Sequence, residues 1–160
     1  MISETLKNYL KAQKVSYKGV SHPKRFTAQE IAQAEHAPGR EVAKAVIVKA
    51  KGRDWMVVTP ADSMIDLLKL SAVLETDDIR VEEEREFAPL FPECELGAMP
   101  PIGKLYGMNT FVDESFLKNR EIFFNGGDHK ESIVMPVSEY IRIAEAEIAD
   151  FAVRREILHA

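Results

Sequence analysis

The sequence predicts a mixed α/β domain of the α+β kind, in which helices and strands follow one another without a regular βαβ repeat. Stretches such as VIVKA and MVVTP are apolar and strand-like, whereas TLKNYLKA places apolar residues at helical spacing. The chain has 160 residues, 46% of them hydrophobic and 29% charged, which suits one globular domain over residues 1–160. We therefore expect a mixed sheet flanked by helices.

The first part of the chain predicts two helices and a short strand. A helix is expected over residues 3–14, because Ser3 can cap it and apolar residues recur along one stripe. The next stretch, VSYKGV, alternates like a strand. A capping box, TAQE, opens a second helix expected over 28–36, and the following APGR ends it.

The middle of the chain predicts a hairpin and a long helix. Residues 40–51 and 54–60 read as two strands joined by the turn Lys51-Gly52-Arg53. Residues 61–74, ADSMIDLLKLSAVL, have apolar side chains near helical spacing and are expected to be a helix. Residues 77–92 are first acidic and then aromatic, and we expect a helix followed by a loop.

The last third predicts three strands and a helical end. The loop ELGAMPPIGKLYG comes first, and a helix-prone stretch over 137–151 comes last, helical at least in part. The expected strands are residues 109–113, 121–125 and 132–136. A short helical turn separates the first two strands, and the tight turn NGGDHKE separates the second from the third.

The composition of the chain bears on its expected cellular location. No apolar run reaches the roughly 18 residues needed to span a bilayer, and the N-terminal stretch lacks the apolar centre of a signal peptide. Cys94 is the only cysteine, so an internal disulfide and a CxxC metal site are excluded. We therefore expect a cytoplasmic protein without a membrane partner.

Charge is distributed unevenly along the chain. Residues 1–55 contain 11 Lys and Arg against 5 Asp and Glu, whereas residues 56–160 contain 10 against 21. The net charge of −5 argues against DNA as a partner, but a basic end is typical of a surface that faces a polyanion. The alternative is that both sets are ordinary solvated faces, and charge alone leaves this open.

The sequence contains none of the common catalytic or metal-binding motifs. The four histidines have no HxxxH or HxH spacing, and there is no GxSxG elbow, P-loop or dinucleotide fingerprint. Cys94 lies between Glu93 and Glu95, whose charges should raise the pKa of its thiol and make it a poor nucleophile. No metal, cofactor or nucleophilic triad is therefore predicted.

One lysine stands out in the first strand of the hairpin. Successive strand residues point to opposite faces, so Lys44 shares a face with Val42, Val46 and Val48. A half-buried ammonium is costly unless oxygen atoms surround it. Lys44 is therefore a candidate to bind phosphate or ester oxygens. The alternative is that its side chain extends to solvent or pairs with a carboxylate.

Two glycine-containing loops are the other candidates. In GAMPPIG, residues 97–103, two prolines stiffen a loop whose backbone amides and carbonyls can line a small pocket, and Gly97 allows close approach. In NGGDHKE, two glycines precede Asp128 and His129. A proline-rich turn and an ordinary hairpin turn are the respective alternatives.

In combination these pieces resemble the YbaK-type aminoacyl-tRNA editing domain, which is also found inserted in bacterial prolyl-tRNA synthetases. The resemblance rests on the AKAVIVKA strand, GAMPPIG and the closing FFNGGDHKESIVMPVSEYIRI, and it runs from SHPKRFTAQEIA to YIRI. The closing third is most similar to the freestanding YeaK branch. The family implies a mixed, partly barrel-like sheet flanked by helices, hydrolysis of mischarged aminoacyl-tRNA, and no cofactor or metal.

The resemblance also assigns residues. Lys44 matches the family's lysine and Gly97 to Pro101 its GxxxP loop. The family's lysine holds phosphate or ester oxygens near the tRNA 3′ end, and the vicinal hydroxyl of the terminal adenosine helps to position the water. The expected catalytic residues are Lys44 and Gly97, and the expected substrate-binding residues are His22, Val46, Ala98, Met99, Pro100, Pro101, Asn125, Gly126, Gly127 and His129.

Our leading expectation is a freestanding deacylase that binds the 3′ aminoacyl-adenosine end of a mischarged tRNA, with an aminoacyl-tRNA synthetase as a further partner. The pocket, sized by Met99, Ile47 and Val46 or Val48, points to a small amino acid such as alanine, serine, threonine or cysteine. The residues expected to touch the acceptor stem are Lys11, Lys14, Lys18, Lys24 and Arg25. A non-catalytic adaptor for tRNA or a synthetase, and a binding domain for a small anionic molecule, remain alternatives.

Overall fold

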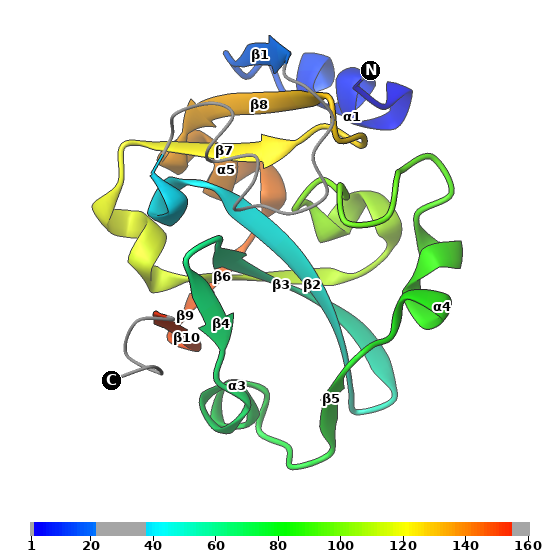
Figure 1. The fold of residues 1–160 in the computed structure, drawn as a ribbon, viewed down its shortest axis with the longest axis vertical. Coiled ribbons are helices and arrows are strands. Elements are labelled where there is room, and N and C mark those ends of the chain that lie inside the picture. Colours follow the sequence, from blue (N-terminus) through cyan, green and yellow to red (C-terminus); the bar gives the residue numbers. More distant parts are fainter. Residues whose placement is uncertain (1, 22–37, 155–160) are drawn as a thin grey trace.

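The computed structural model describes residues 2–21 and 38–154, and within them the expected mixture of helices and strands is confirmed (Figure 1). The strands are β1 (Lys18–Ser21), β2 (Ala43–Ala50), β3 (Arg53–Pro60), β4 (Ser63–Ile65), β5 (Ile79–Val81), β6 (Asn109–Asp113), β7 (Glu121–Asn125), β8 (Glu131–Pro136), β9 (Glu147–Ala149) and β10 (Ala152–Arg154). The helices are α1 (Glu4–Ala12), α3 (Leu67–Leu74), α4 (Glu84–Phe87) and α5 (Val137–Ala144), with short 3-10 turns η1 (Gly39–Glu41), η2 (Ala88–Leu90), η3 (Gly103–Tyr106) and η4 (Glu114–Lys118).

The strands of the described segments form three sheets that do not close into a barrel. Their orders are β1-β8-β7, β10-β4 and β5-β2-β3-β6-β9. The largest sheet is mixed, because β2 and β3 are antiparallel whereas β6 runs parallel to both β3 and β9. The partly barrel-like sheet implied by the family is thus an open one here. None of the helices in these segments is long and apolar enough to cross a membrane.

The β2–β3 hairpin is confirmed, and its turn sets the register of the strands. Lys51 and Gly52 have φ values of 54° and 71°, the left-handed pair that a two-residue turn between twisted strands favours. Ala50 therefore pairs with Arg53 and Lys44 with Thr59. Residues paired in this way have side chains on the same face of the sheet.

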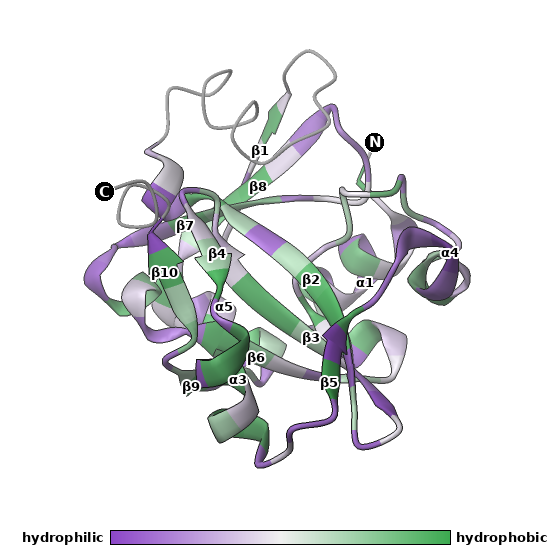
Figure 2. Cartoon of the chain, turned by 60° about the horizontal axis from the view of Figure 1, so that its bottom comes forward, coloured by the Kyte–Doolittle hydropathy of each residue, from purple (hydrophilic) through white to green (hydrophobic). Residues whose placement is uncertain are grey.

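Alternation along the hairpin separates two hydrophobic cores. Figure 2 shows that β2 and β3 are hydrophobic over much of their length. Ile47 of β2 and Met56 of β3 belong to one core, which also contains Tyr140 of α5. Val48 and Trp55, which point the other way, belong to a second core beneath α3. The Lys44 face of β2 is therefore the face of this second core.

Strand β2 also connects two sheets. Val42 forms a parallel bridge with Phe123 of β7 at the start of β2, whereas β5 pairs with residues 48–50 at its far end. The intervening residues 44–47 lie between these two partners. Lys44 therefore lies at the point where β2 leaves β7.

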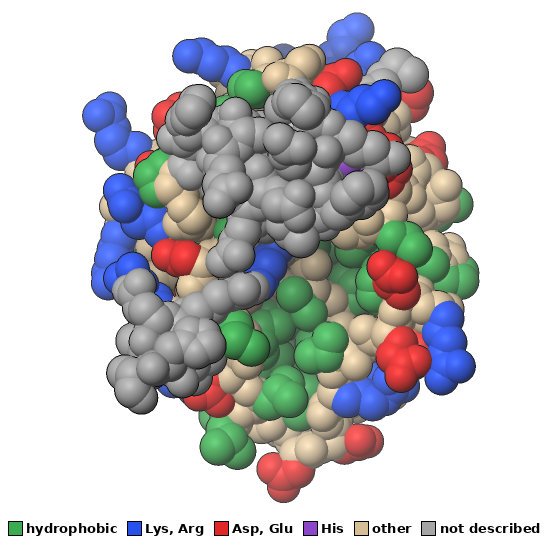
Figure 3. Space-filling view, in the orientation of Figure 1, with side chains coloured by type: hydrophobic (Ala, Val, Ile, Leu, Met, Phe, Trp, Pro, Cys, Tyr) green, Lys and Arg blue, Asp and Glu red, His purple; other side chains and the backbone are tan. Residues whose placement is uncertain are grey.

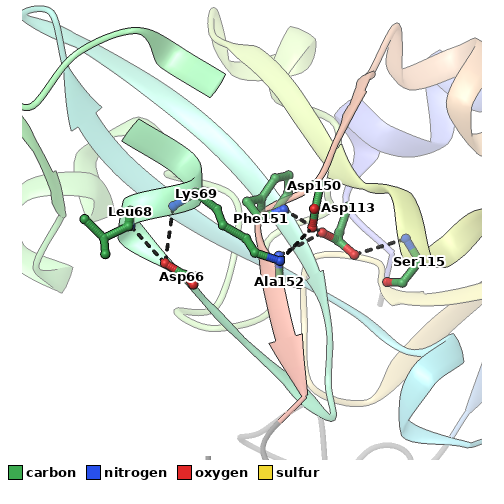
Figure 4. A network of polar contacts seen from close by, with 8 residues as sticks. All are labelled: Asp66, Leu68, Lys69, Asp113, Ser115, Asp150, Phe151 and Ala152. Atoms are coloured by element: carbon green, nitrogen blue, oxygen red, sulfur yellow. Dashed lines mark hydrogen bonds and ion pairs between the residues drawn. The ribbon is translucent and has the colours of Figure 1, made fainter. Parts of the chain in front are cut away.

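The helix expected over 61–74 begins later than predicted. Residues 63–65 form β4, and Asp66 caps α3 by accepting hydrogen bonds from the amides of Leu68 (3.0 Å) and Lys69 (3.2 Å) (Figure 4). An aspartate that satisfies two free amides starts a helix efficiently, and the residues before it are released to pair with β10.

The end of the chain is helical only in part, as expected, but its strands were not predicted. Glu145, in a left-handed conformation with φ of 48°, ends α5, and β9 and β10 follow. The buried carboxylate of Asp113 holds this segment by accepting hydrogen bonds from the amides of Phe151 (3.0 Å) and Ala152 (2.8 Å) (Figure 4). Strand β5, within the stretch read as helix and loop, was also missed.

Other expected elements are confirmed. Ser3 caps α1 by accepting from the amide of Leu6 (3.3 Å), and the short strand before the turn is β1. The three strands of the last third are β6, β7 and β8. The helix expected over 28–36 lies outside the described residues.

A carboxyl pair lies at the closed end of the hairpin. Glu82 is 5% exposed. Burial raises its pKa to about 7, and its hydrogen bond and repulsion with Asp54 act in the same direction. The pKa of Asp54 is lowered by the hydrogen bonds from Glu82 and Lys49, whose Nζ lies 2.9 Å from Asp54 Oδ1. The pair therefore retains a proton near neutral pH.

This pair predicts a pH-dependent stability. Between the unfolded pKa of 4.5 and the folded value of about 7, the folded chain binds more protons at Glu82 than the unfolded chain, so the free energy of unfolding falls as pH rises. Urea unfolding from pH 5 to 8 should show a decline on the order of 1 to 3 kcal/mol. Glu82→Gln keeps a hydrogen-bond donor toward Asp54 but cannot titrate, so the free energy of unfolding of this variant should change little over the same pH range. An equal decline in the two proteins would contradict the assignment of the raised pKa to Glu82.

Candidate active site

The two glycine-containing loops predicted from the sequence lie against each other. The amide of Gly127 donates to the carbonyl of Ala98 (3.1 Å), and the amide of Glu95 donates to the carbonyl of Gly127 (2.8 Å). Gly97 and Gly127 have φ values of 84° and 113°. Such backbone conformations are easy for glycine alone, which explains why glycine occupies both positions.

The GxxxP loop is also anchored along its length. Gly97 is exposed, but Ala98, Met99, Pro100 and Pro101 are buried. The hydroxyl of Tyr140, fully buried on α5, donates to the carbonyl of Pro101 (2.6 Å). Burial raises the pKa of this hydroxyl, which keeps it a donor. The loop is therefore rigid, with its Gly97 end turned outward.

Lys44 is half-buried, and strand register places polar side chains on either side of it. Thr59 pairs with Lys44 directly. The bridge between Val42 and Phe123 lies two residues before Lys44 on β2 and two residues before Asn125 on β7, so Lys44 and Asn125 share a face. Asn125 in turn connects to the loop, because its side-chain Nδ2 lies 3.5 Å from the carbonyl oxygen of Gly97.

These residues belong to a polar row that crosses four strands. Ser132 of β8 pairs with Asn125. The row is defined as Thr59, Lys44, Asn125 and Ser132. It combines the Thr59–Lys44 pair of β3 and β2 with the Asn125–Ser132 pair of β7 and β8, and the bridge between Val42 and Phe123 joins the two pairs. Thr59 and Ser132 are 0% exposed and Asn125 is 7% exposed, so three of the four side chains in the row are buried. A buried row of this kind requires polar partners.

Two atoms of the polar row have no such partner in the described part of the chain. These are the hydroxyl oxygen of Thr59 and the side-chain carbonyl oxygen of Asn125, both buried. Leaving a buried polar atom unsatisfied costs on the order of 1–3 kcal/mol. Natural proteins accept such a cost at binding sites, where a ligand supplies the missing hydrogen bond.

The remaining expected site residues have structural contacts. His129 is 1% exposed, and its Nε2 lies 2.8 Å from the carbonyl oxygen of Leu96, so the ring holds the loop. The carbonyl of Gly126 accepts from the amide of Ser3 (2.8 Å), and a Cβ on Gly126 would lie 2.9 Å from Ile2 Cγ1. The start of α1 thus packs on the turn. Roles of these residues in substrate binding stay predictions.

The side chains expected to size the pocket do not lie on one face. Val46 is half-buried on the face of Lys44 and packs against the second core. Ile47 and Met99 belong to the first core, and Val48 is fully buried. Of the β2 residues, Val46 therefore has the position best suited to contact a ligand at Lys44. His22 lies outside the described residues.

Cys94 is half-buried and has a raised pKa, as expected. The main cause is burial, with the charge of Glu93 adding to it and a contact with the Tyr106 hydroxyl opposing it. The thiol is therefore a poor nucleophile at neutral pH. The main cause is burial, whereas the sequence had suggested the charges of the neighbouring glutamates.

Comparisons with known proteins identify the family of the chain. Residues 22–143 match the model of the aminoacyl-tRNA editing domain family. The Escherichia coli (strain K12) protein named multifunctional Ser/Thr-tRNA deacylase ProXp-y is 28% identical over 114 residues, which is 68% of either chain. A proline–tRNA ligase of Leuconostoc citreum (strain KM20) is 24% identical over 160 residues, which cover 96% of this chain and 28% of the ligase.

A solved structure supports the fold. The crystal structure of a protein described as a candidate trans-editing enzyme for prolyl tRNA synthetase superimposes with a TM-score of 0.83 and 21% identity. The match covers 96% of this chain and 99% of that chain. The family model covers most of the chain described above, including Lys44, the GxxxP loop and the NGGDH turn. The chain therefore belongs to the aminoacyl-tRNA editing domain family, the YbaK-type hydrolases that its sequence resembles.

Proposed function

We propose that this chain is a trans-editing deacylase that hydrolyses the ester of tRNA mischarged with a small amino acid of the alanine, serine, threonine and cysteine class. The observation that carries the proposal is the half-buried Lys44, which pairs with Thr59 and shares a face with Asn125. Asn125 in turn contacts the GxxxP loop. The name of the E. coli relative favours serine and threonine within this class.

The chemistry required is modest, because an aminoacyl ester is already activated. A water oxygen adds to the ester carbonyl, and the negative charge on the carbonyl oxygen is stabilised. The bond to the ribose oxygen then breaks while that oxygen takes up the proton that the water has lost. The ammonium of Lys44 supplies a positive charge in apolar surroundings, where electrostatic contacts are strong. The adjacent ribose hydroxyl helps to orient the water, as the family resemblance implies.

The amide of Gly97 is suited to assist at the oxyanion. Its partner among the described atoms is the sulfur of Met99 at 3.3 Å, a weak acceptor. A developing oxyanion is a far stronger acceptor and would take over this donor. The left-handed conformation of Gly97 keeps the amide at the exposed end of the loop.

The assay that tests the proposal measures amino acid released from a panel of alanyl-, seryl-, threonyl- and cysteinyl-tRNA. We expect release from seryl- or threonyl-tRNA, and none with Lys44→Ala. Release from no member of the panel overturns the proposal. Saturable tRNA binding without release would instead favour the non-catalytic adaptor, and binding of neither tRNA nor its aminoacyl end would favour a domain for small anions.

Thr59 was not predicted as a site residue, and its hydroxyl gives a test that separates function from stability. Valine has the same shape but removes an unsatisfied buried oxygen, so Thr59→Val should raise the free energy of unfolding by about 1 kcal/mol. If the hydroxyl positions the Lys44 ammonium or the substrate, kcat should nevertheless fall about tenfold, and Thr59→Ser should restore it. A stabilised variant with unchanged kcat excludes this role.

An aminoacyl-tRNA synthetase is proposed as a further partner. Support comes from the proline–tRNA ligase that contains a region similar to nearly all of this chain. Addition of prolyl-tRNA synthetase should lower the KM for mischarged tRNA if the two proteins associate, and an unchanged KM argues against the partnership.

A further inference from the structure

Three cations near the start of β2 have no ionic partner among the described residues. Several lysines and arginines of the described segments lie beside a carboxylate, as Lys69 does with Asp150 (3.1 Å). Arg40, Lys118 and Arg120 are exposed, and no carboxylate in the described segments lies within 4.0 Å of them. Unpaired cations that gather in an acidic protein suggest a site for an anionic partner.

These three side chains line a surface groove, here called the basic groove and defined by Arg40, Lys118 and Arg120. Its volume is about 660 Å³, and a neighbouring groove of about 240 Å³ shares Arg40 and Lys118 with it. Figure 3 shows Lys and Arg side chains gathered along the edge of the molecule where Figure 1 places η4. Glu41 and Glu121 line the basic groove as well, so its charge is mixed and suits separate phosphate contacts rather than a broad positive field.

The walls of the basic groove are held by hydrogen bonds to backbone carbonyls. The side-chain amide of Asn119 donates to the carbonyl of Arg40 (2.8 Å), which joins the turn at η1 to the end of η4. The amide of Val137 donates to the carbonyl of Arg120 (3.0 Å). The cations are therefore presented from a fixed backbone, which lowers the entropy cost of binding.

The basic groove is also close to the candidate active site. Arg40 precedes Lys44 by four residues, and four residues span at most about 14 Å. Phosphates along one strand of a duplex advance by about 3.4 Å each. A strand whose 3′ end reaches Lys44 therefore brings phosphates a few nucleotides away to the basic groove.

We propose that the basic groove binds backbone phosphates of the tRNA acceptor end, a few nucleotides from the ester held at Lys44. This inference rests on the proposed function and names the surface by which that function would recognise RNA. It is an alternative to the surface expected from the sequence, which comprises Lys11, Lys14, Lys18, Lys24 and Arg25. Of these residues, Lys24 and Arg25 lie outside the described part of the chain.

The test measures binding of a fluorescent acceptor-arm RNA hairpin over a range of salt concentrations. The groove variant combines Arg40→Gln, Lys118→Gln and Arg120→Gln, and the matched control combines Lys11→Gln, Lys14→Gln and Lys18→Gln, with the same change of charge. The groove variant should raise Kd at least tenfold and reduce the slope of log Kd against log salt by about two to three, one phosphate contact per side chain. The control should change neither quantity appreciably. A loss confined to the control variant, or no loss in either, overturns the inference.

A second measurement separates this inference from the proposed function. Hydrolysis of seryl-adenosine, an ester without phosphates, should proceed at the same rate in the wild type and the groove variant, whereas the KM for mischarged tRNA rises in the variant. Equal loss on both substrates would show that the substitutions disturb the active site and would overturn the inference. If the wild type hydrolyses neither substrate, the proposed function fails, but hairpin binding still decides the role of the basic groove.

Discussion

Replacing Lys44 with alanine is expected to lower the single-turnover rate of deacylation by at least about 100-fold, the usual effect of removing one charge-stabilising group from an active site. The free energy of unfolding should change by less than about 1 kcal/mol, because the lost contacts of a half-buried ammonium are offset by removal of its desolvation cost. Rapid-quench measurement of amino acid released from seryl-tRNA gives the rate, and urea unfolding gives the stability.

Two control variants sharpen this prediction. Lys44→Met keeps most of the aliphatic chain and removes the charge, so it should be as inactive as the alanine variant. Lys49 lies on the same strand but on the opposite face, where it pairs with Asp54, so Lys49→Ala should retain the wild-type rate. An active Lys44→Met enzyme would show that the side chain acts by packing rather than by charge.

Replacing Gly127 with alanine is expected to reduce both stability and deacylation. The φ value of 113° lies beyond the left-handed region that alanine tolerates, and the new Cβ would lie 3.1 Å from the Cβ of Ser3. The chain must shift here, and the hydrogen bonds of Gly127 with Ala98 and Glu95 hold the GxxxP loop. We expect a loss of about 2 kcal/mol in stability and at least about tenfold in kcat/KM.

Gly52 provides a matched control for this substitution. It also has a positive φ, 71°, but lies at the tip of the hairpin, where a Cβ added to it would meet no described atom within 4 Å. Gly52→Ala should therefore cost about 1 kcal/mol of stability and leave deacylation unchanged. Equal activity losses in the two variants would mean that general destabilisation, rather than displacement of the GxxxP loop, explains the effect at Gly127.

Local sequence signals predicted the parts of the fold in which neighbouring residues determine the structure. The Ser3 cap, the β2–β3 hairpin and the β7–β8 hairpin each follow from a short stretch of the chain. The hairpin turn also determines which residues of the two strands face each other. Once Lys51 and Gly52 are read as a two-residue turn, register places Thr59 beside Lys44, so the position of Thr59 was predictable from the sequence.

Elements that depend on distant partners were not predictable in this way. Strands β4 and β10 have three residues each and are stabilised by pairing with one another and by the buried Asp113. Their residues also fit a helix, and only the tertiary contact decides between the two structures. The placement of Val46 and Met99 in different cores likewise follows from how the sheet is covered on each side, which a single strand's pattern does not reveal.

Contacts between distant parts of the chain also limited what the charge pattern could predict about an anion-binding surface. The count over residues 1–55 located an excess of basic residues, but it could not show which cations would find carboxylates after folding. Arg40 came from this basic segment, whereas Lys118 and Arg120 came from the acidic remainder of the chain. A groove assembled from segments about 80 residues apart is visible only in the folded molecule.

The most direct test of this account is a crystal structure with a non-hydrolysable seryl-adenosine analogue, in which an amide replaces the ester. We expect the analogue on the Lys44 face of β2, with its carbonyl oxygen within hydrogen-bonding distance of Lys44 Nζ and the seryl group between Val46 and the Gly97 end of the loop. An analogue bound at another surface, or bound here without contact to Lys44, would contradict the account.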